Sequence, residues 1–143
     1  MKKWALGLLV SGASMLVATV SGAAPQNDAS SQVHGSQNIK SANYQISVSQ
    51  AACKAGAECT VSVKLDALGV FHLNKEYPHK VKVDEAAGVS WSKKEFGKSS
   101  GDFAEANEKS GTITLKFKAE KAGKVELSGK FKFAVCSEGT CNP

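Results

Sequence analysis

The chain has 143 residues, enough for one small domain with a modest core, and carries 18 basic against 13 acidic residues. Every basic residue is a lysine. Specific nucleic-acid recognition relies on the guanidinium fork of arginine, so this composition argues against a nucleic-acid partner. The sequence also lacks a P-loop, a dinucleotide-binding glycine pattern and a recognisable Ser-His-Asp set, so the corresponding enzyme classes have no support.

Residues 1–23 have the layout of a secretory signal peptide. Lys2 and Lys3 precede an apolar stretch, and the small residues from Ser21 to Ala24 end it. We expect cleavage after Ala23, export to the periplasm or a similar compartment, and no membrane span after removal of the signal. An uncleaved anchor is the alternative, because the segment is close to the minimum spanning length.

The mature chain is expected to begin with a flexible leader, residues 24–41. This segment is rich in Ser, Gln and Asn and has few apolar side chains to offset the entropy of ordering it. The remaining residues, 42–143, form the expected domain.

Within that domain, apolar residues recur at every second position, which is the period of a β-strand. This pattern, with turn residues between its runs, predicts an all-β fold, an immunoglobulin-like antiparallel β-sandwich of about seven strands. Residues 93–109 are expected to be a long surface loop. Residues 120–123 are expected to form a hairpin loop between the last two long strands. The expected strands lie at 44–48, 61–65, 71–74, 81–83, 89–91, 113–117 and 125–135.

Four cysteines lie in the mature chain, and disulfides persist in exported proteins. Four cysteines can pair in three ways, and sequence does not fix the choice. Local pairing is the simplest prediction, because Cys53 and Cys59 lie just before one strand and Cys136 and Cys141 just after another. A disulfide across so short a loop contributes about 2 kcal/mol to the free energy of unfolding, whereas one from Cys53 to Cys136 would contribute about 4.5 kcal/mol.

Two interpretations of the pair Cys136 and Cys141 stay open at this point. The bond could clamp the end of the chain, or it could exchange electrons with a partner, since a short loop constrains disulfide geometry. Gly139 is expected to allow a left-handed turn inside this loop. A zinc site is a third interpretation, although the spacing of Cys53 and Cys59 is wider than structural zinc favours.

The segments FAVCSEGTCNP, residues 133–143, and FHLNKEYP, residues 71–78, resemble the N-terminal periplasmic domain of the thiol:disulfide interchange protein DsbD. The resemblance implies an immunoglobulin-like fold and a reactive pair at Cys136 and Cys141, followed by Pro143. It also implies a thioredoxin-like partner and an aromatic loop that covers the pair. The candidate cover residues are Phe71, His72 and Tyr77, with Phe96 and Phe103 as alternatives.

The leading hypothesis is therefore an exported thiol–disulfide exchange module that acts through Cys136 and Cys141, with Cys53 and Cys59 in a structural disulfide. The alternative is a non-catalytic immunoglobulin-like binding module in which both disulfides are structural. Neither hypothesis calls for a metal or another cofactor.

Overall fold

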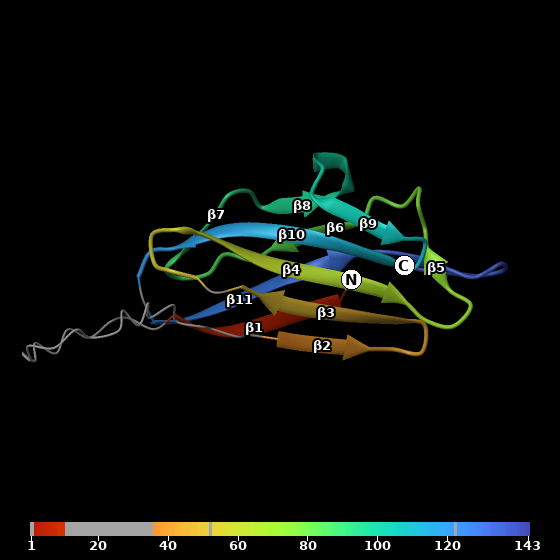
Figure 1. Cartoon of the computed structure of the whole chain (residues 1–143), viewed down its shortest axis with the longest axis horizontal. Helices are drawn as coiled ribbons and strands as arrows, with labels where there is room; N and C mark the ends of the chain where they lie inside the picture. Colours follow the sequence, from red (N-terminus) through yellow and green to blue (C-terminus); the bar gives the residue numbers. More distant parts are fainter. Residues whose placement is uncertain (1, 11–35, 52, 122) are drawn as a thin grey trace, which may run out of the picture.

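The computed structural model describes residues 2–10, 36–51, 53–121 and 123–143, and these residues form an all-β sandwich (Figure 1). This confirms the predicted fold class, whereas the immunoglobulin-like strand order remains a prediction. The described residues contain thirteen strands, more than the seven or so expected, and one short 3-10 segment, η1. The strands are β1 (Lys2–Val10), β2 (Ser36–Lys40), β3 (Tyr44–Gln50), β4 (Glu58–Ala67), β5 (His72–Leu73), β6 (Lys80–Val83), β7 (Val89–Trp91), β8 (Glu95–Gly97), β9 (Phe103–Asn107), β10 (Ser110–Ala119), β11 (Gly123–Lys132), β12 (Val135–Cys136) and β13 (Cys141–Asn142).

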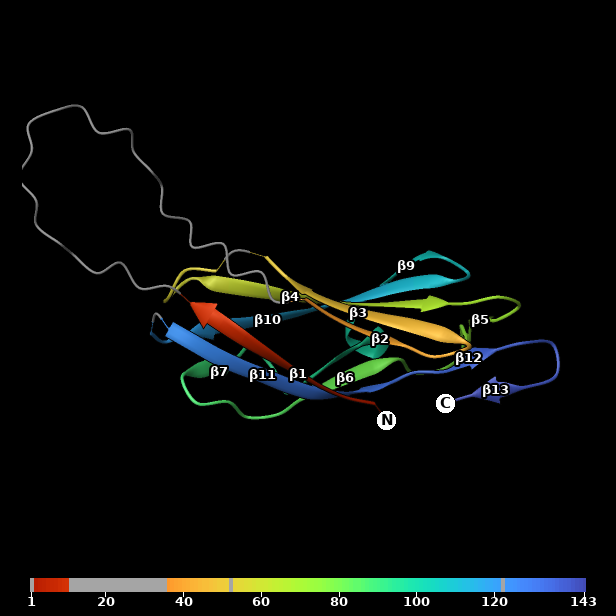
Figure 2. The same ribbon diagram turned by 90° about the horizontal axis from the view of Figure 1, so that it is seen from below.

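Two sheets make up the body of the sandwich. The first has the strand order β1-β11-β6-β8, and the second has the order β2-β3-β4-β10-β7, with β9 also paired to β10. Figure 2 shows these layers from the side, with β3 and β4 in one and β11 and β6 in the other. A small third sheet, β13-β12-β5, lies at one end, and we call it the end ribbon.

Strand alternation explains the core. Inward positions of β3, β4 and β10 are buried, including Ile46, Val63 and Leu115, while the residues between them are at least partly exposed. Leu127 and Phe131 of β11 are likewise fully buried. The sheets therefore pack through one apolar face each, as the period of two predicts.

The hairpin expected at residues 120–123 does not form. β10 pairs with β4, β7 and β9, whereas β11 pairs with β1 and β6, so the connection crosses from one sheet to the other. β10 and β11 each have one apolar face. Both faces are buried because the two strands lie in opposite sheets of the sandwich.

The last long strand is also interrupted. β11 ends at Lys132 and β12 begins at Val135, so Phe133 and Ala134 carry the chain from the first sheet into the end ribbon. Both of these residues are buried.

Residues 93–109 are not the long loop that the sequence predicts. They contain β8, η1 (Lys98–Ser100) and β9, and Phe96 of β8 is buried against the core. Asp102 organises this segment, since its carboxylate accepts hydrogen bonds from the Gly97 N–H at 3.0 Å and the Ser100 hydroxyl at 2.6 Å. Two large apolar residues in seventeen are too few to give a strand period, which explains the wrong prediction.

The sheet begins earlier than the predicted boundary at residue 42. Ser36–Lys40 forms β2, which pairs with β3, and Ile39 packs against the core. Residues 24–35 of the expected leader lie outside the described residues. Within the expected signal peptide, Lys2–Val10 forms β1 and residues 11–23 lie outside the described residues, so the signal peptide remains a prediction.

Candidate functional site

The end ribbon holds the Cys136–Cys141 disulfide in a tight hairpin. The Ser137 N–H donates to the Thr140 carbonyl at 2.8 Å, and the next pair along the hairpin is Cys136 opposite Cys141. Side chains approach most closely at a non-hydrogen-bonded pair of this kind, and the two Cα atoms are 4.0 Å apart. The register of the hairpin thus places the two cysteines directly opposite each other.

The second disulfide joins Cys53 and Cys59 in the connection between β3 and β4. The prediction of two local pairs is therefore confirmed, and none of the four cysteines is free. Gly139 does not adopt the left-handed conformation expected of it, because its φ is not positive.

The two disulfides differ sharply in exposure. Cys53 and Cys59 are 3% and 2% exposed and belong to the hydrophobic core. Cys136 is also buried, at 6%, but Cys141 is exposed to solvent. Thiol–disulfide exchange requires an external thiolate to reach a sulfur, and Cys141 is the only one of the four cysteine residues that is exposed.

Strand β5 covers the other side of Cys136. His72 lies opposite Cys136 in the ladder and Leu73 lies opposite Val135. The backbone continues this contact, because the Asn74 N–H donates to the Ala134 carbonyl at 3.1 Å. A pocket of about 400 Å³ opens here, lined by His72, Leu73, Asn74, Lys75, Glu108 and Cys136.

The charges in this pocket bear on a thiolate at Cys136. Lys75 would stabilise the anion, whereas Glu108 would oppose it. Lys132 and Glu138, the charged residues nearest to Cys136 in the sequence, do not line this pocket. The Lys132 ammonium lies 5.7 Å from the centre of the Tyr77 ring in a different pocket, and Glu138 is at the exposed tip of the hairpin. Sequence reasoning missed Lys75 and Glu108, although Lys75 lies inside the FHLNKEYP segment.

Of the three candidate cover residues, His72 lies beside Cys136 in the ladder. Phe71 is half-buried and packs against the core, and Tyr77 lines the neighbouring pocket. Phe96 is in the core, and the Phe103 ring stacks on His79 at 4.9 Å between centroids. Among the candidate cover residues, the one opposite Cys136 in the ladder is thus a histidine and not a phenylalanine or tyrosine.

The segment from Asn74 to His79 contributes residues to both pockets, Asn74 and Lys75 to the first and Tyr77 to the neighbouring one. The Asn74 carbonyl accepts hydrogen bonds from the Tyr77 N–H at 3.2 Å and from Nε2 of His79 at 2.8 Å. The Asn74 side chain accepts one from the Glu76 N–H at 3.0 Å. These bonds hold a compact turn directly after β5.

His79 anchors this turn from inside the protein. It is completely buried, and burial is the main reason that its pKa is lowered. Its Nε2–H donates to Asn74, and its Nδ1 has no hydrogen-bond partner among the described residues. The sequence did not single out His79. This residue nevertheless continues the every-second-residue spacing of Val81 and Val83, the buried residues of the next strand.

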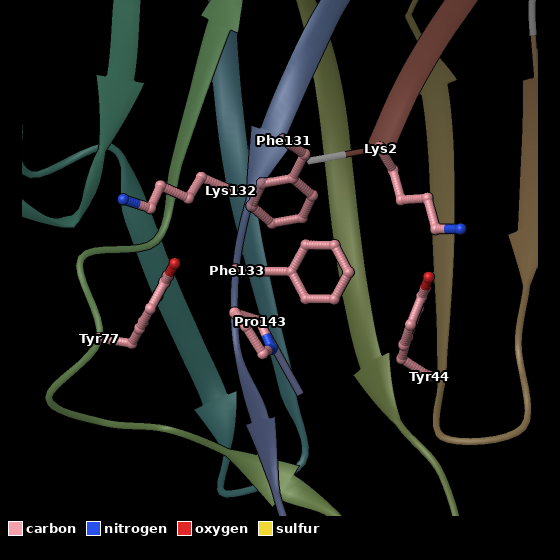
Figure 3. A pocket seen from close by; sticks show the side chains of 7 residues that line it. All are labelled: Lys2, Tyr44, Tyr77, Phe131, Lys132, Phe133 and Pro143. Atoms are coloured by element: carbon pink, nitrogen blue, oxygen red, sulfur yellow. The ribbon is translucent and has the colours of Figure 1, made fainter. Parts of the chain in front are cut away.

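The neighbouring pocket has a volume of about 470 Å³ (Figure 3). The Phe131 and Phe133 rings lie at its centre, Tyr44 and Tyr77 flank it on opposite sides, and the Lys2 and Lys132 ammonium groups point outward. Pro143, which follows the cysteine hairpin in the sequence, also lines this pocket and lies below Phe133 in this view.

Across residues 2–10, 36–51, 53–121 and 123–143, no cluster of three or more His, Cys, Asp or Glu side chains could hold a metal ion. In the same ranges, no helix has the length and apolar character needed to cross a membrane. Comparison of the chain with family models, with curated proteins and with solved structures gave no match.

Proposed function

We propose that the chain is an exported thiol–disulfide exchange module that passes electrons through Cys136 and Cys141 to or from a thioredoxin-like partner. The observation that carries the proposal is the exposure of Cys141 beside a buried Cys136, in contrast to the fully buried Cys53–Cys59 bond. An exchange centre needs one accessible sulfur, and a purely structural bond does not.

The exchange proceeds through a mixed disulfide. A thiolate of the reduced partner attacks Sγ of Cys141, a bond forms between the partner and Cys141, and Cys136 leaves as a thiolate. The second thiolate of the partner then attacks the partner sulfur that is bonded to Cys141, and this attack releases the Cys141 thiolate. Two electrons pass to the module, and the partner is left with an internal disulfide. The reverse sequence transfers electrons outward.

The pocket around Cys136 supports this order of events. Cys136 is the buried sulfur, so it is the leaving group and not the point of attack. A leaving thiol with a lower pKa departs faster. Lys75 and His72 line the pocket into which that charge would develop, with Glu108 as the opposing charge.

The test is partial reduction of the native protein by a thioredoxin-like donor, followed by alkylation and peptide mapping. Cys136 and Cys141 should be labelled first, and Cys53–Cys59 in the same molecule is the matched control. In redox buffers the exposed bond should titrate at about −200 to −270 mV, whereas a structural bond in an exported protein lies below about −300 mV. If the end-ribbon pair resists the donor until the protein is denatured, the non-catalytic binding module takes the place of this proposal.

Single variants provide a second test. Cys136→Ala leaves the exposed Cys141 thiol and should trap a mixed disulfide with a thioredoxin-like partner. Cys141→Ala leaves the buried Cys136 thiol and should trap the partner at least about tenfold more slowly. Equal trapping by the two variants would contradict the assignment of Cys141 as the attacked sulfur.

A further inference from the structure

One edge of β11 accepts a further β-strand by backbone pairing, and we call this edge the seat. β1 occupies it in antiparallel register from Lys2 opposite Phe131 to Val10 opposite Gly123. β1 is the edge strand of the first sheet, and β11 pairs with β6 on its other side. Removal of β1 would therefore leave one full row of β11 backbone groups without partners.

The seat is also shaped for particular side chains. Trp4 and Leu6 of β1 are 2% and 4% exposed and form part of the core. Trp4 lies opposite Gly129, where a Cβ atom would come within 2.7 Å of the Lys82 carbonyl oxygen and within 3.1 Å of the indole ring. The glycine thus leaves room both for the β6 backbone and for the large ring. The seat selects an aromatic residue opposite Gly129 and an aliphatic residue opposite Leu127.

One feature of β1 does not suit the seat. Lys3 lies directly opposite Lys130, and like charges facing each other across a strand pair are destabilising. A strand with an acidic residue at this position would fit better than β1 does.

We propose that, once residues 1–23 are removed, the β11 edge binds an extended segment of a partner polypeptide by β-strand addition. This inference rests on the proposed export of the chain. The segment carries an acidic residue opposite Lys130, an aromatic residue opposite Gly129 and an aliphatic residue opposite Leu127. The chain's own residues 24–35, APQNDASSQVHG, contain no aromatic residue and so do not match the seat.

The seat leads to the redox site. β11 continues through Phe133 and Ala134 into Cys136. Lys2, at the start of β1, and Pro143, beside the cysteine hairpin, line the same pocket (Figure 3). The two chain ends lie close together in both overall views (Figures 1 and 2). A strand that binds as β1 does would therefore present its N-terminal end next to the exchange centre.

The test uses the full chain with a protease site inserted between Ala23 and Ala24 and with both disulfides intact. After cleavage, fluorescently labelled synthetic peptides corresponding to Lys2–Val10 compete with the released fragment, and anisotropy reports their binding. The peptide set contains the native sequence, Lys3→Glu, Trp4→Ala, and a double substitution with proline at Ala5 and Leu6. Neighbouring N–H groups of a strand point in opposite directions, so one of the two prolines must remove a donor to β11.

The native peptide should bind with one peptide per chain, and the Lys3→Glu peptide should bind several-fold more tightly at low salt, with the advantage fading at high salt. Trp4→Ala should weaken binding at least about tenfold, and the proline peptide should not compete. Equal binding of all four peptides would overturn the proposal. So would unfolding of the cleaved chain when the fragment dissociates, detected by circular dichroism, or self-association that excludes the peptides. The order in which the two disulfides are reduced is measured on the uncleaved, folded chain, so the proposed function is tested separately.

Discussion

His79 should make the stability of the domain depend on pH. Its side chain is completely buried, and its pKa is lowered chiefly by burial, with the nearby charge of Lys98 acting in the same direction and that of Glu105 against it. In the unfolded chain this imidazole takes up a proton as the pH falls through about 6.5, whereas in the folded chain it does so only at lower pH. The stability that neutral His79 contributes is therefore fully present above about pH 6.5 and is lost as the pH falls below that value.

The magnitude follows from linkage. If the folded imidazole stays neutral, the free energy of unfolding falls by up to about 1.4 kcal/mol between about pH 7.5 and 5.5. The structural reason is that protonation would place an N–H on Nδ1, which has no acceptor among the described residues. The Nε2–H bond to Asn74 is already made in the neutral form.

His79→Phe is the matching variant, because it keeps a ring stacked on Phe103 and cannot titrate. The Asn74 carbonyl retains the Tyr77 N–H as a donor, so the variant does not leave that oxygen unpaired. Urea denaturation of both proteins across this pH range should show wild type losing stability relative to the variant as the pH falls. Should the variant fail to fold, an NMR titration of wild type gives the His79 pKa directly. A wild-type–variant difference that does not change with pH, or a His79 pKa at or above about 6.5, would refute the argument.

Four further outcomes can be checked by urea denaturation. Gly97→Ala should destabilise the domain by about 2 kcal/mol, because its Cβ would come within 2.6 Å of the backbone carbonyl oxygen of His79, the residue just before β6. Gly139→Ala, in the cysteine hairpin, should change stability by less than about 0.5 kcal/mol, since its φ is not positive and no atom lies within 4 Å of the added Cβ. Phe117→Ala should cost about 3–5 kcal/mol, because the ring is 1% exposed. Burial would raise the pKa of Asp102, but hydrogen bonds from Lys93, Ser100 and the Gly97 N–H hold that pKa below its ordinary value. Asp102→Asn should therefore cost about 2 kcal/mol near neutral pH, and this difference from wild type should shrink as the pH falls below about 4.

The sequence alone predicted the strands with clear alternation and favoured the two local disulfides without fixing the pairing. Alternation of apolar and polar residues is a local property, so the strands around Ile46, Val63 and Leu115 could be located without any knowledge of their partners. The cysteine pairs are also local, and the Cys136–Cys141 hairpin closes within the segment that contains it.

Tertiary structure decided which strands pair and which sulfur is exposed. The connection after β10 looked like a hairpin because its two flanking strands share one period, but whether such strands lie side by side or face each other depends on what else packs between them. The contrast between exposed Cys141 and buried Cys53 likewise depends on neighbours from distant parts of the chain. The seat on β11, with Trp4 fitted over Gly129, joins residues more than a hundred positions apart, and no local pattern could have revealed it.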